Sequence, residues 1–159
     1  MLVYRIVHKK YSTGLLASGL QGRWNSAGKK VIYTAESIPL AFLENMVRRQ
    51  GVGFNKDFRI IINEIPDSII ISSINLFDLE DGWRDFRDYS KCQLIGDKWY
   101  DEGKVMVLKV PSAVLPEAFD YVINSEFSDY GMIKLIATTD LVPDERIEDL
   151  LKKYPKNRN

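Results

Sequence analysis

Three side chains in the first third of the chain are suited to binding a small ligand that carries a phosphate and a flat ring. Arg23 lies in a glycine-flanked turn, from which a guanidinium can hold a phosphate or diphosphate through two parallel hydrogen bonds. Tyr33 follows in a short apolar segment, where its ring can stack on a heteroaromatic group while its hydroxyl stays hydrogen-bonded. At 100° per residue, Glu44 lies beside Leu40 and Val47 on the apolar face of a predicted helix. A carboxylate there is costly unless it is paired or takes part in chemistry.

Glu44 and the basic residues also have a purely structural interpretation, which the sequence leaves open. Glu44 precedes Arg48 by one helical turn, in the order that favours an ion pair on the helix surface. Residues 1–49 carry eight Lys or Arg against two Glu, a net of +6 that the rest of the chain balances with −6. This excess indicates either a solvated basic face or a site for a small anion, and charge alone does not decide between them.

The residue inventory excludes several kinds of catalytic centre. The chain has one histidine, His8, and one cysteine, Cys92, so a zinc cluster of His and Cys ligands is excluded. A Ser-His-Asp or Cys-His site would depend on His8, which lies on a short predicted strand near the N-terminus. Glu36 and Glu44 are eight residues apart and do not form the close carboxylate pair of an ordinary glycosidase.

The glycine-rich segment 22–30, GRWNSAGKK, is not a phosphate-binding P-loop. Five residues separate its glycines where four are required, and no Ser or Thr follows the lysine. The segment also leads into a predicted strand, whereas a P-loop leads into the N-terminus of a helix. No GxGxxG motif occurs in the chain, which disfavours a Rossmann-type dinucleotide site.

Length and composition describe an ordinary globular protein. The 159 residues are 45% hydrophobic and 28% charged, which corresponds to about one domain and excludes a disordered chain. The 22 basic and 22 acidic side chains balance, so no global field directs the protein to nucleic acid or to an anionic membrane. No apolar run is long enough for a membrane helix, the first residues do not resemble a signal peptide, and a single cysteine suits a reducing compartment. We therefore expect a cytoplasmic protein.

Short apolar segments rich in β-branched and aromatic residues alternate with three helical patterns. The predicted strands are 2–7, 31–34, 58–65, 68–71, 104–110, 119–123 and 132–137. The first helix is expected to begin at the capping residue Ser37 and to end at Gly51 and Gly53. Ser90 and Gln93 form a capping-box pattern for a second helix that runs to about 102, after an irregular acidic segment 78–88. A third helix is expected over 144–153.

These elements predict a single domain over 1–159, with a core of about 4–153 and a frayed basic tail. The strands do not alternate regularly with helices, which favours an α+β domain with a mostly antiparallel or mixed sheet.

Five segments, taken in order, resemble the RES domain family, which is named after its Arg, Glu and Ser. They are 22–26 (GRWNS), 31–37 (VIYTAES), 40–44 (LAFLE), 94–99 (LIGDKW) and 110–114 (VPSAV). The resemblance extends from about Tyr4 to Ala137. One departure lies after the predicted strand 119–123, where the family tends to have Asn-Pro-x-His and this chain has Asn124 followed by Ser-Glu-Phe.

The resemblance implies a fold, an activity and a set of site residues. RES proteins are toxins of bacterial toxin–antitoxin pairs whose fold resembles the ADP-ribosyltransferase toxins and whose activity is cleavage of the nicotinamide–ribose bond of NAD. The implied catalytic residues are Glu44 and Ser112, and the implied substrate-binding residues are Arg23, Tyr33 and Asn124. NAD would be the substrate, so neither a cofactor nor a metal is expected. The expected partner is an Xre-type antitoxin with a DNA-binding half; self-association is left open.

This activity suits the residue inventory. Nicotinamide leaves as a neutral molecule from a cationic precursor, so its departure requires no general acid and no second carboxylic acid. In this hypothesis Arg23 binds the diphosphate, Tyr33 packs on nicotinamide, and Glu44 hydrogen-bonds the ribose and stabilises the developing positive charge. Ser112 would orient the ribose or Glu44.

The ADP-ribosyl acceptor is not specified by the sequence. Water, phosphate and a protein side chain share the same first step, and we rank hydrolysis first. A non-catalytic binding module and an RNase toxin are the alternatives of other classes. The RNase has little support, because the chain lacks a basic patch with interleaved aromatic residues.

Overall fold

The strands form one seven-stranded sheet in the order β4-β5-β6-β2-β1-β3-β7. The computed structural model describes residues 1–49, 56–147 and 149. Neighbouring strands are antiparallel except β4 and β5, which are parallel, so the predicted α+β fold with a mostly antiparallel sheet is confirmed. The strands are β1 (Leu2–His8), β2 (Val31–Ala35), β3 (Phe58–Glu64), β4 (Ile71–Ser73), β5 (Val107–Pro111), β6 (Phe119–Asn124) and β7 (Lys134–Asp140).

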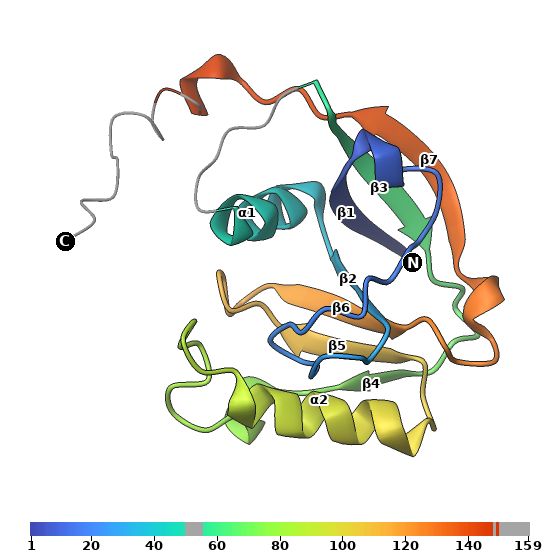
Figure 1. The fold of residues 1–159 in the computed structure, drawn as a ribbon, viewed down its shortest axis with the longest axis vertical. Helices are drawn as coiled ribbons and strands as arrows, with labels where there is room; N and C mark the ends of the chain where they lie inside the picture. The colour runs from blue at the N-terminus through green and yellow to red at the C-terminus, as the bar shows by residue number, and fades with distance from the viewer. Residues whose placement is uncertain (50–55, 148, 150–159) are drawn as a thin grey trace.

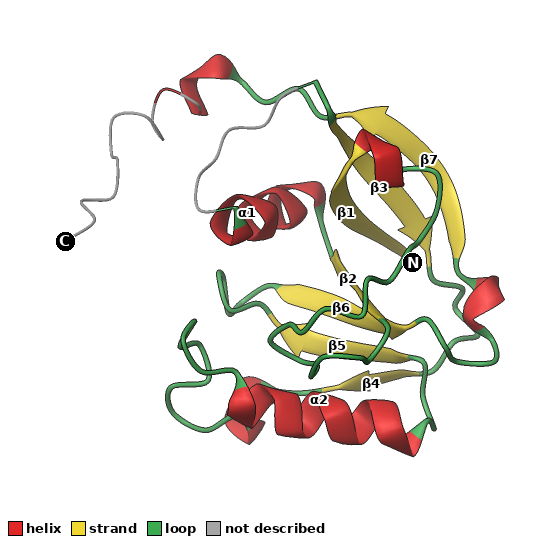
Figure 2. Ribbon diagram, viewed as in Figure 1, coloured by secondary structure: helices red, strands yellow, loops and turns green. Residues whose placement is uncertain are grey.

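The sheet divides into two halves between β1 and β2. These two strands share a single residue pair, Tyr4 with Ala35, whereas β1 pairs with β3 along its whole length. Figure 1 shows the consequence: β1, β3 and β7 run upright, and β6, β5 and β4 lie stacked across the lower part of the molecule. The helix α1 (Ile38–Arg48) covers the junction, and α2 (Ser90–Glu102) covers the half formed by β4, β5 and β6 (Figure 2).

Both helices pack on the same face of the sheet. Val31, Tyr33 and Ala35 project from one face of β2, because side chains alternate along a strand. Ala35 belongs to the apolar cluster beneath α1, and Val31 and Tyr33 belong to the cluster beneath α2. Ile32, on the opposite face, belongs to a third cluster. The two helices therefore pack at opposite ends of the same face of β2, α1 over Ala35 and α2 over Val31 and Tyr33.

The first helix follows its sequence signals. The hydroxyl of Ser37 accepts a hydrogen bond from the backbone N–H of Leu40 at 3.3 Å, and Pro39 lies in the first turn, as predicted. Leu40 and Ala41 are buried against the sheet. Glu44 follows Leu40 by four residues and therefore lies on the same side of the helix. The helix ends at Arg48, and the glycines predicted to end it lie outside the described residues.

The capping box predicted for the second helix is wrong. Tyr89 occupies the N-cap position without a side-chain capping bond, and the backbone N–H of Ser90 donates to the carboxylate of Asp88. The Gln93 amide instead donates to the backbone carbonyls of Gly22 (2.9 Å) and Asn25 (3.2 Å). These carbonyls belong to a distant turn that docks on the helix, and they replace the local capping interaction.

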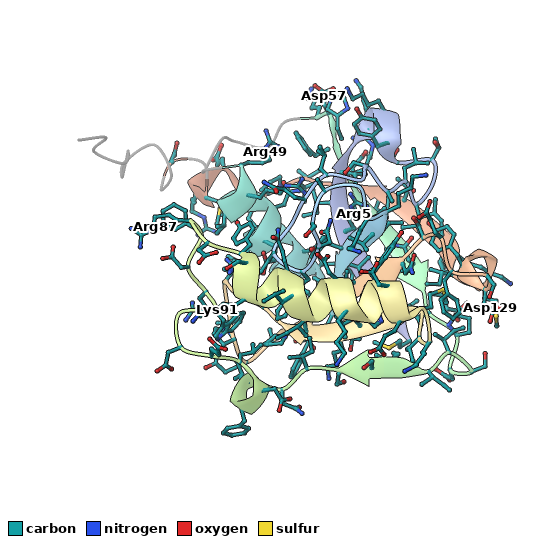
Figure 3. All side chains as sticks on the ribbon, turned by 60° about the horizontal axis from the view of Figure 1, so that its bottom comes forward. Arg5, Arg49, Asp57, Arg87, Lys91 and Asp129 are labelled. Carbon is teal, nitrogen blue, oxygen red and sulfur yellow. The ribbon has the colours of Figure 1, made fainter. Side chains whose placement is uncertain are left out.

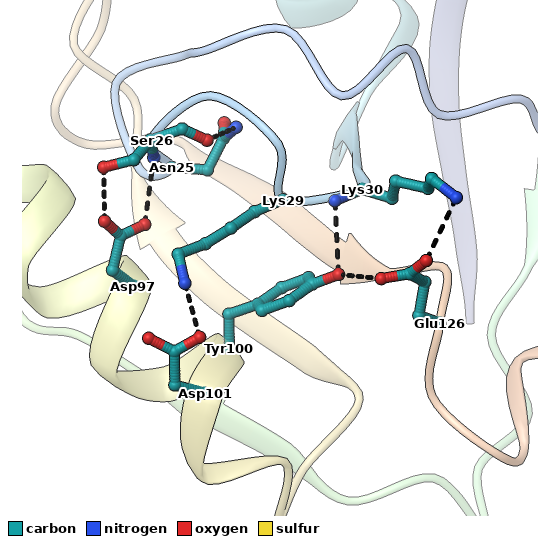
Figure 4. A network of polar contacts seen from close by, with 8 residues as sticks. All are labelled: Asn25, Ser26, Lys29, Lys30, Asp97, Tyr100, Asp101 and Glu126. Carbon is teal, nitrogen blue, oxygen red and sulfur yellow. Dashed lines mark hydrogen bonds and ion pairs between the residues drawn. The ribbon is translucent and has the colours of Figure 1, made fainter.

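The segment 22–30 is held against α2 by a network of polar contacts (Figure 4). The Asp97 carboxylate accepts hydrogen bonds from both the backbone N–H (2.9 Å) and the hydroxyl of Ser26. Lys29 forms an ion pair with Asp101 on the same helix. The Tyr100 hydroxyl accepts from the backbone N–H of Lys30 (3.2 Å) and donates to Glu126 at 2.6 Å. The helix therefore fixes the turn that carries Arg23.

The remaining elements differ from expectation mainly at their ends. The backbone N–H of Ile69 donates to the carbonyl of Pro66 at 3.0 Å, which forms a turn and delays β4 to Ile71. Short 3-10 helices occupy Lys9–Tyr11, Leu76–Asp78 and Tyr130–Met132, so β7 begins only at Lys134. Residues 145–147 and 149 are helical, and the rest of the third predicted helix after 147 lies outside the described residues. In the ranges that the structure describes, no helix is long and apolar enough to cross a membrane.

Gly96 on α2 lies directly against the backbone of the turn 22–30, and its substitution tests whether this contact stabilises the fold. A Cβ at position 96 would lie 1.9 Å from the backbone carbonyl oxygen of Trp24. We expect Gly96→Ala to lower the free energy of unfolding by about 1–3 kcal/mol, because the turn must move. Gly131→Ala is the matched control, since a Cβ there has nothing within 4 Å, and its effect should stay within about 0.5 kcal/mol. Equal thermal stability of the two variants would contradict the docking argument.

Candidate active site

Glu44 on α1 and Ser112 after β5 are brought into direct contact. The hydroxyl of Ser112, the residue directly after β5, lies 2.5 Å from Oε1 of the half-buried Glu44. The same hydroxyl oxygen accepts hydrogen bonds from the backbone N–H groups of Val114 (3.1 Å) and Leu115 (3.0 Å). Its lone pairs are thereby occupied, so its proton is donated to Glu44. Among the described residues Glu44 forms no ion pair with Arg48, and the surface-pair interpretation of Glu44 is therefore wrong.

A second acidic residue, Asp120 on β6, joins this pair. Its side chain lies on the helix-bearing face, because it is two residues from Val122, which pairs with Tyr33. Burial raises the pKa of Asp120 to about 9, and the charge of Glu44, a hydrogen bond with Glu44 and the charge of Glu36 act in the same direction. Sequence reasoning missed Asp120. The available signal was an acidic residue at an inward-facing position of a predicted strand.

The hydroxyl of Tyr33 is used in hydrogen bonds within the protein, so its ring is the part that a ligand could contact. The hydroxyl donates to the side-chain oxygen of Asn25 at 2.7 Å and accepts from the backbone N–H of Trp24 at 2.9 Å. Burial raises the pKa of this phenol above its usual value, so it stays protonated. Gly22 leaves room for it, since a Cβ there would lie 2.6 Å from the hydroxyl oxygen. The hydroxyl is hydrogen-bonded as the sequence led us to expect, and stacking of the half-buried ring on a ligand stays a prediction.

Arg23 orders the loop that follows β4. Its guanidinium donates to the backbone carbonyls of residues 83, 84 and 85 and lies over the Tyr89 ring, 4.6 Å from the ring centroid. Arg84 in this loop donates to the backbone carbonyl of Ala113 at 2.9 Å, next to Ser112. A chain of contacts therefore links Arg23 to Glu44 on one side of the molecule. The contact between Arg23 and a diphosphate stays a prediction.

Three arginines of the first third of the chain have no acidic partner among the described residues. Within residues 1–49 and 56–147, Arg5, Arg23 and Arg48 form no ion pair, whereas Lys9 and Lys30 pair with Asp57 (2.7 Å) and Glu126 (3.1 Å) at the surface. The charges of Arg48 and Arg23 both act on Tyr33.

Arg5 was not selected from the sequence, because an isolated arginine in a strand carries no local signal. It lies toward the middle of the molecule in Figure 3, whereas Asp57 and Arg87 lie at the periphery. Burial and the charge of Arg48 lower the pKa of Arg5 to about 10, with an opposing effect from Tyr130. Arg5 and Arg23 are half-buried and Arg48 is exposed, and cations without counter-charges are suited to an anionic ligand. The basic excess of the first third therefore consists partly of lysines at the surface and partly of arginines that have no acidic partner among the described residues.

Asn124 lies away from the Glu44–Ser112 contact. It pairs with Val31 at one end of β6, whereas Asp120 pairs with Ala35 at the other end, about 13 Å along the strand. Its side-chain oxygen accepts a hydrogen bond from the backbone N–H of Glu126 at 2.9 Å and forms a turn. The structure does not bring Asn124 to Glu44 or Ser112, although it lies two residues from Val122, the partner of Tyr33, and its contact with substrate stays a prediction.

The assembled groups suit a ligand that is positive at one point and negative at another. Glu44 accepts a hydrogen bond from Ser112, and a carboxylate in this place can stabilise a positive centre. Unpaired guanidinium groups can bind phosphate. In the part of the chain that the structure describes, no group of three or more His, Cys, Asp or Glu residues could hold a metal ion.

Comparison with known proteins places the chain among toxins. The RES domain family model matches residues 2–144. A protein named Toxin Res from Pseudomonas putida is 30% identical, over 92% of this chain and 99% of that protein, and a Toxin Res from Yersinia enterocolitica is 31% identical, over 82% and 88%. A Sphingobium protein named Prs ADP-ribosylating toxin is 30% identical over 71% of each chain.

A solved structure shares the fold. One chain of the MbcT–MbcA toxin–antitoxin complex of Mycobacterium tuberculosis superposes with a TM-score of 0.72 at 19% identity, and the match covers 96% of this chain and 87% of that one. Because the family model spans nearly the whole chain and the curated relatives match over most of their length, this protein belongs to the RES domain family.

Proposed function

We propose that this protein is a toxin that depletes NAD by cleaving the bond between nicotinamide and ribose, with water as the acceptor. The observation that carries the proposal is Glu44, held by the Ser112 hydroxyl at 2.5 Å on the face of the sheet that also bears the Tyr33 ring. The toxin names of the curated relatives support the biological role.

NAD matches the charges of the site. Its diphosphate is anionic, and the unpaired guanidinium groups of Arg5 and Arg48 would bind it together with the donors of Arg23 that remain free. The Tyr33 ring would pack on nicotinamide. Glu44 would hydrogen-bond the ribose and stabilise the positive charge that grows as the bond breaks, an interaction that is stronger in the transition state than in the bound substrate.

Ser112 and Asn124 would have different functions. Ser112 is buried and its donor is already used on Glu44, so it would orient Glu44 rather than contact the ribose. Asn124 lies at the far end of β6, where only a distal part of the dinucleotide would meet it.

A second candidate reaction is transfer of ADP-ribose to a protein, which the relative named Prs ADP-ribosylating toxin favours. Phosphorolysis is the third use of the same first step. Chromatography of the products with and without phosphate separates hydrolysis, which gives ADP-ribose in both cases, from phosphorolysis, which gives ADP-ribose phosphate only with phosphate. Labelled protein bands after incubation with labelled NAD and cell extract would instead indicate protein transfer.

The proposed partner is an Xre-type antitoxin with a DNA-binding half. The toxin–antitoxin complex that contains the structural neighbour supports it. Co-purification with a helix-turn-helix protein encoded beside this gene, together with loss of NAD cleavage in the complex, tests it. Full NAD cleavage by a stable complex would argue against inhibition by that partner.

One prediction of this proposal concerns Glu44→Gln, which keeps the shape of the side chain and removes its charge. We expect NAD cleavage to fall by about 10²–10³, because the positive charge of the transition state loses its stabilising carboxylate. Toxicity in the host should disappear, and thermal unfolding should show a folded protein. Release of nicotinamide is the measurement, and toxicity equal to that of the unaltered protein would reject the role of Glu44.

A second prediction of this proposal concerns Arg48→Gln, with Arg146→Gln as the matched control. Arg146 is exposed and pairs with Asp144 at 2.8 Å, whereas Arg48 has no acidic partner among the described residues. We expect Arg48→Gln to raise the KM for NAD by about 10- to 100-fold, the usual effect of losing a hydrogen bond to a charged group. The control should leave KM unchanged. If both variants have the same KM, Arg48 does not contact the diphosphate.

A further inference from the structure

The site contains two carboxyl groups in contact without a cation between them. Asp120 on β6 pairs with Ala35, which packs beneath α1, and its side chain on that face meets Glu44 of α1 in a hydrogen bond. Neither carboxyl group forms an ion pair with a described residue. Two carboxylates cannot both be ionised at hydrogen-bond distance in a half-buried site, because like charges repel strongly there. The pair must therefore hold one proton.

The contacts of Ser112 indicate which carboxyl group holds this proton. The Ser112 hydroxyl accepts from two backbone N–H groups and so directs its own proton to Oε1 of Glu44. Glu44 is thereby favoured as the ionised acceptor of the pair, since hydrogen bonds to a charged acceptor are the stronger ones. The proton is left to Asp120, and the raised pKa of Asp120, about 9, agrees with this assignment.

We propose that Asp120 is a positioning residue that, in its protonated form, donates a hydrogen bond to Glu44 and fixes it, together with Ser112, as the one ionised carboxylate of the site. The proposal rests on the proposed function, in which Glu44 stabilises the reacting ribose. In this arrangement, Asp120 on β6 and Ser112 after β5 each donate a hydrogen bond to the Glu44 carboxylate on α1. Three separate elements thus determine where the negative charge lies.

The charged groups around Asp120 favour its neutral form. The negative charges of Glu44 on α1 and of Glu36, directly after β2, both favour protonation of Asp120. Tyr33 on β2 is a neutral phenol whose hydroxyl is occupied by Trp24 and Asn25. Arg48 and Arg23 act on Tyr33, and neither of them pairs with Asp120. When Asp120 ionises in alkaline solution, Glu44 loses a donor and gains a repelling neighbour.

The assignment also predicts how stability depends on pH. An aspartate in an unfolded chain loses its proton near pH 3.9, whereas folded Asp120 keeps it up to about pH 9. Between these values the unfolded state binds fewer protons than the folded state, so this residue makes stability fall as pH rises. Asp120→Asn removes that dependence and keeps a donor for Glu44.

The decisive activity experiment compares Asp120→Asn with Asp120→Ala in NAD cleavage from pH 6 to 10, with loss of NAD in protein-free buffer subtracted. We expect kcat of the Asn variant to exceed that of the Ala variant by at least about tenfold at pH 7, because only the amide donates to Glu44. The alkaline decline of the unaltered protein near pH 9 should be absent in the Asn variant. A full kcat in the Ala variant, or equal loss in both, would overturn the positioning role.

A second measurement needs no activity and therefore separates this proposal from the proposed function. Thermal unfolding without NAD should show that the Tm of Asp120→Asn, relative to the unaltered protein, rises between pH 5 and pH 8. Glu44→Gln removes the charge beside Asp120 but not its burial, so it should reduce the pH dependence of Tm even if the Asp120 variants fold poorly. Parallel Tm curves for all three proteins would overturn the proton assignment. Absence of NAD cleavage by the unaltered protein would reject the proposed function alone.

Discussion

The single residue pair between β1 and β2 is the constraint on which the rest of the structure depends. Among the described residues, strand pairing joins the two halves of the sheet only at Tyr4 and Ala35, so side chains must complete the junction. The Asn45 amide donates to the backbone carbonyl of Ile6 at 3.0 Å, and Ser112 donates to Glu44 at 2.5 Å. Such bonds are stronger when water is excluded. The contact that closes the fold over this junction is therefore the same one that orients the proposed catalytic carboxylate.

Sequence patterns over a few residues predicted the helices and strands, whereas contacts between distant residues determined how these elements pack together. The Ser37 cap and the apolar alternation of β1, β3 and β6 were readable because each involves residues only a few positions apart. The Ser90–Gln93 capping box failed because the Gln93 amide bonds carbonyls that lie 71 and 68 residues away. A tertiary partner outweighed a local one, and no window of the sequence contains that partner.

The candidate site divides in the same way. Glu44 was recognisable because a carboxylate on an apolar helical stripe is costly unless it has a partner. Ser112 was reached only through the family resemblance, since a serine after a strand has no distinguishing pattern. Asp120 was missed although its inward-facing position on a predicted strand was a signal, and Arg5 was missed because its significance depends on the absence of an opposite charge around it. That property belongs to the assembled fold, and a single sequence does not express it.

The arrangement of charges is better explained by a ligand than by stability. The helix α1 offers Glu44 and Arg48 at the spacing and in the order that stabilise an isolated helix, yet Glu44 bonds Ser112 and Arg48 has no acidic partner among the described residues. Arg5 keeps its charge beside that of Arg48, although burial and this repulsion lower its pKa. A fold selected for stability alone would neutralise these charges with one another. A carboxylate and several guanidinium groups that stay unpaired with one another suit a ligand that bears both signs, and the proposed substrate, a pyridine nucleotide, has a cationic ring and an anionic diphosphate.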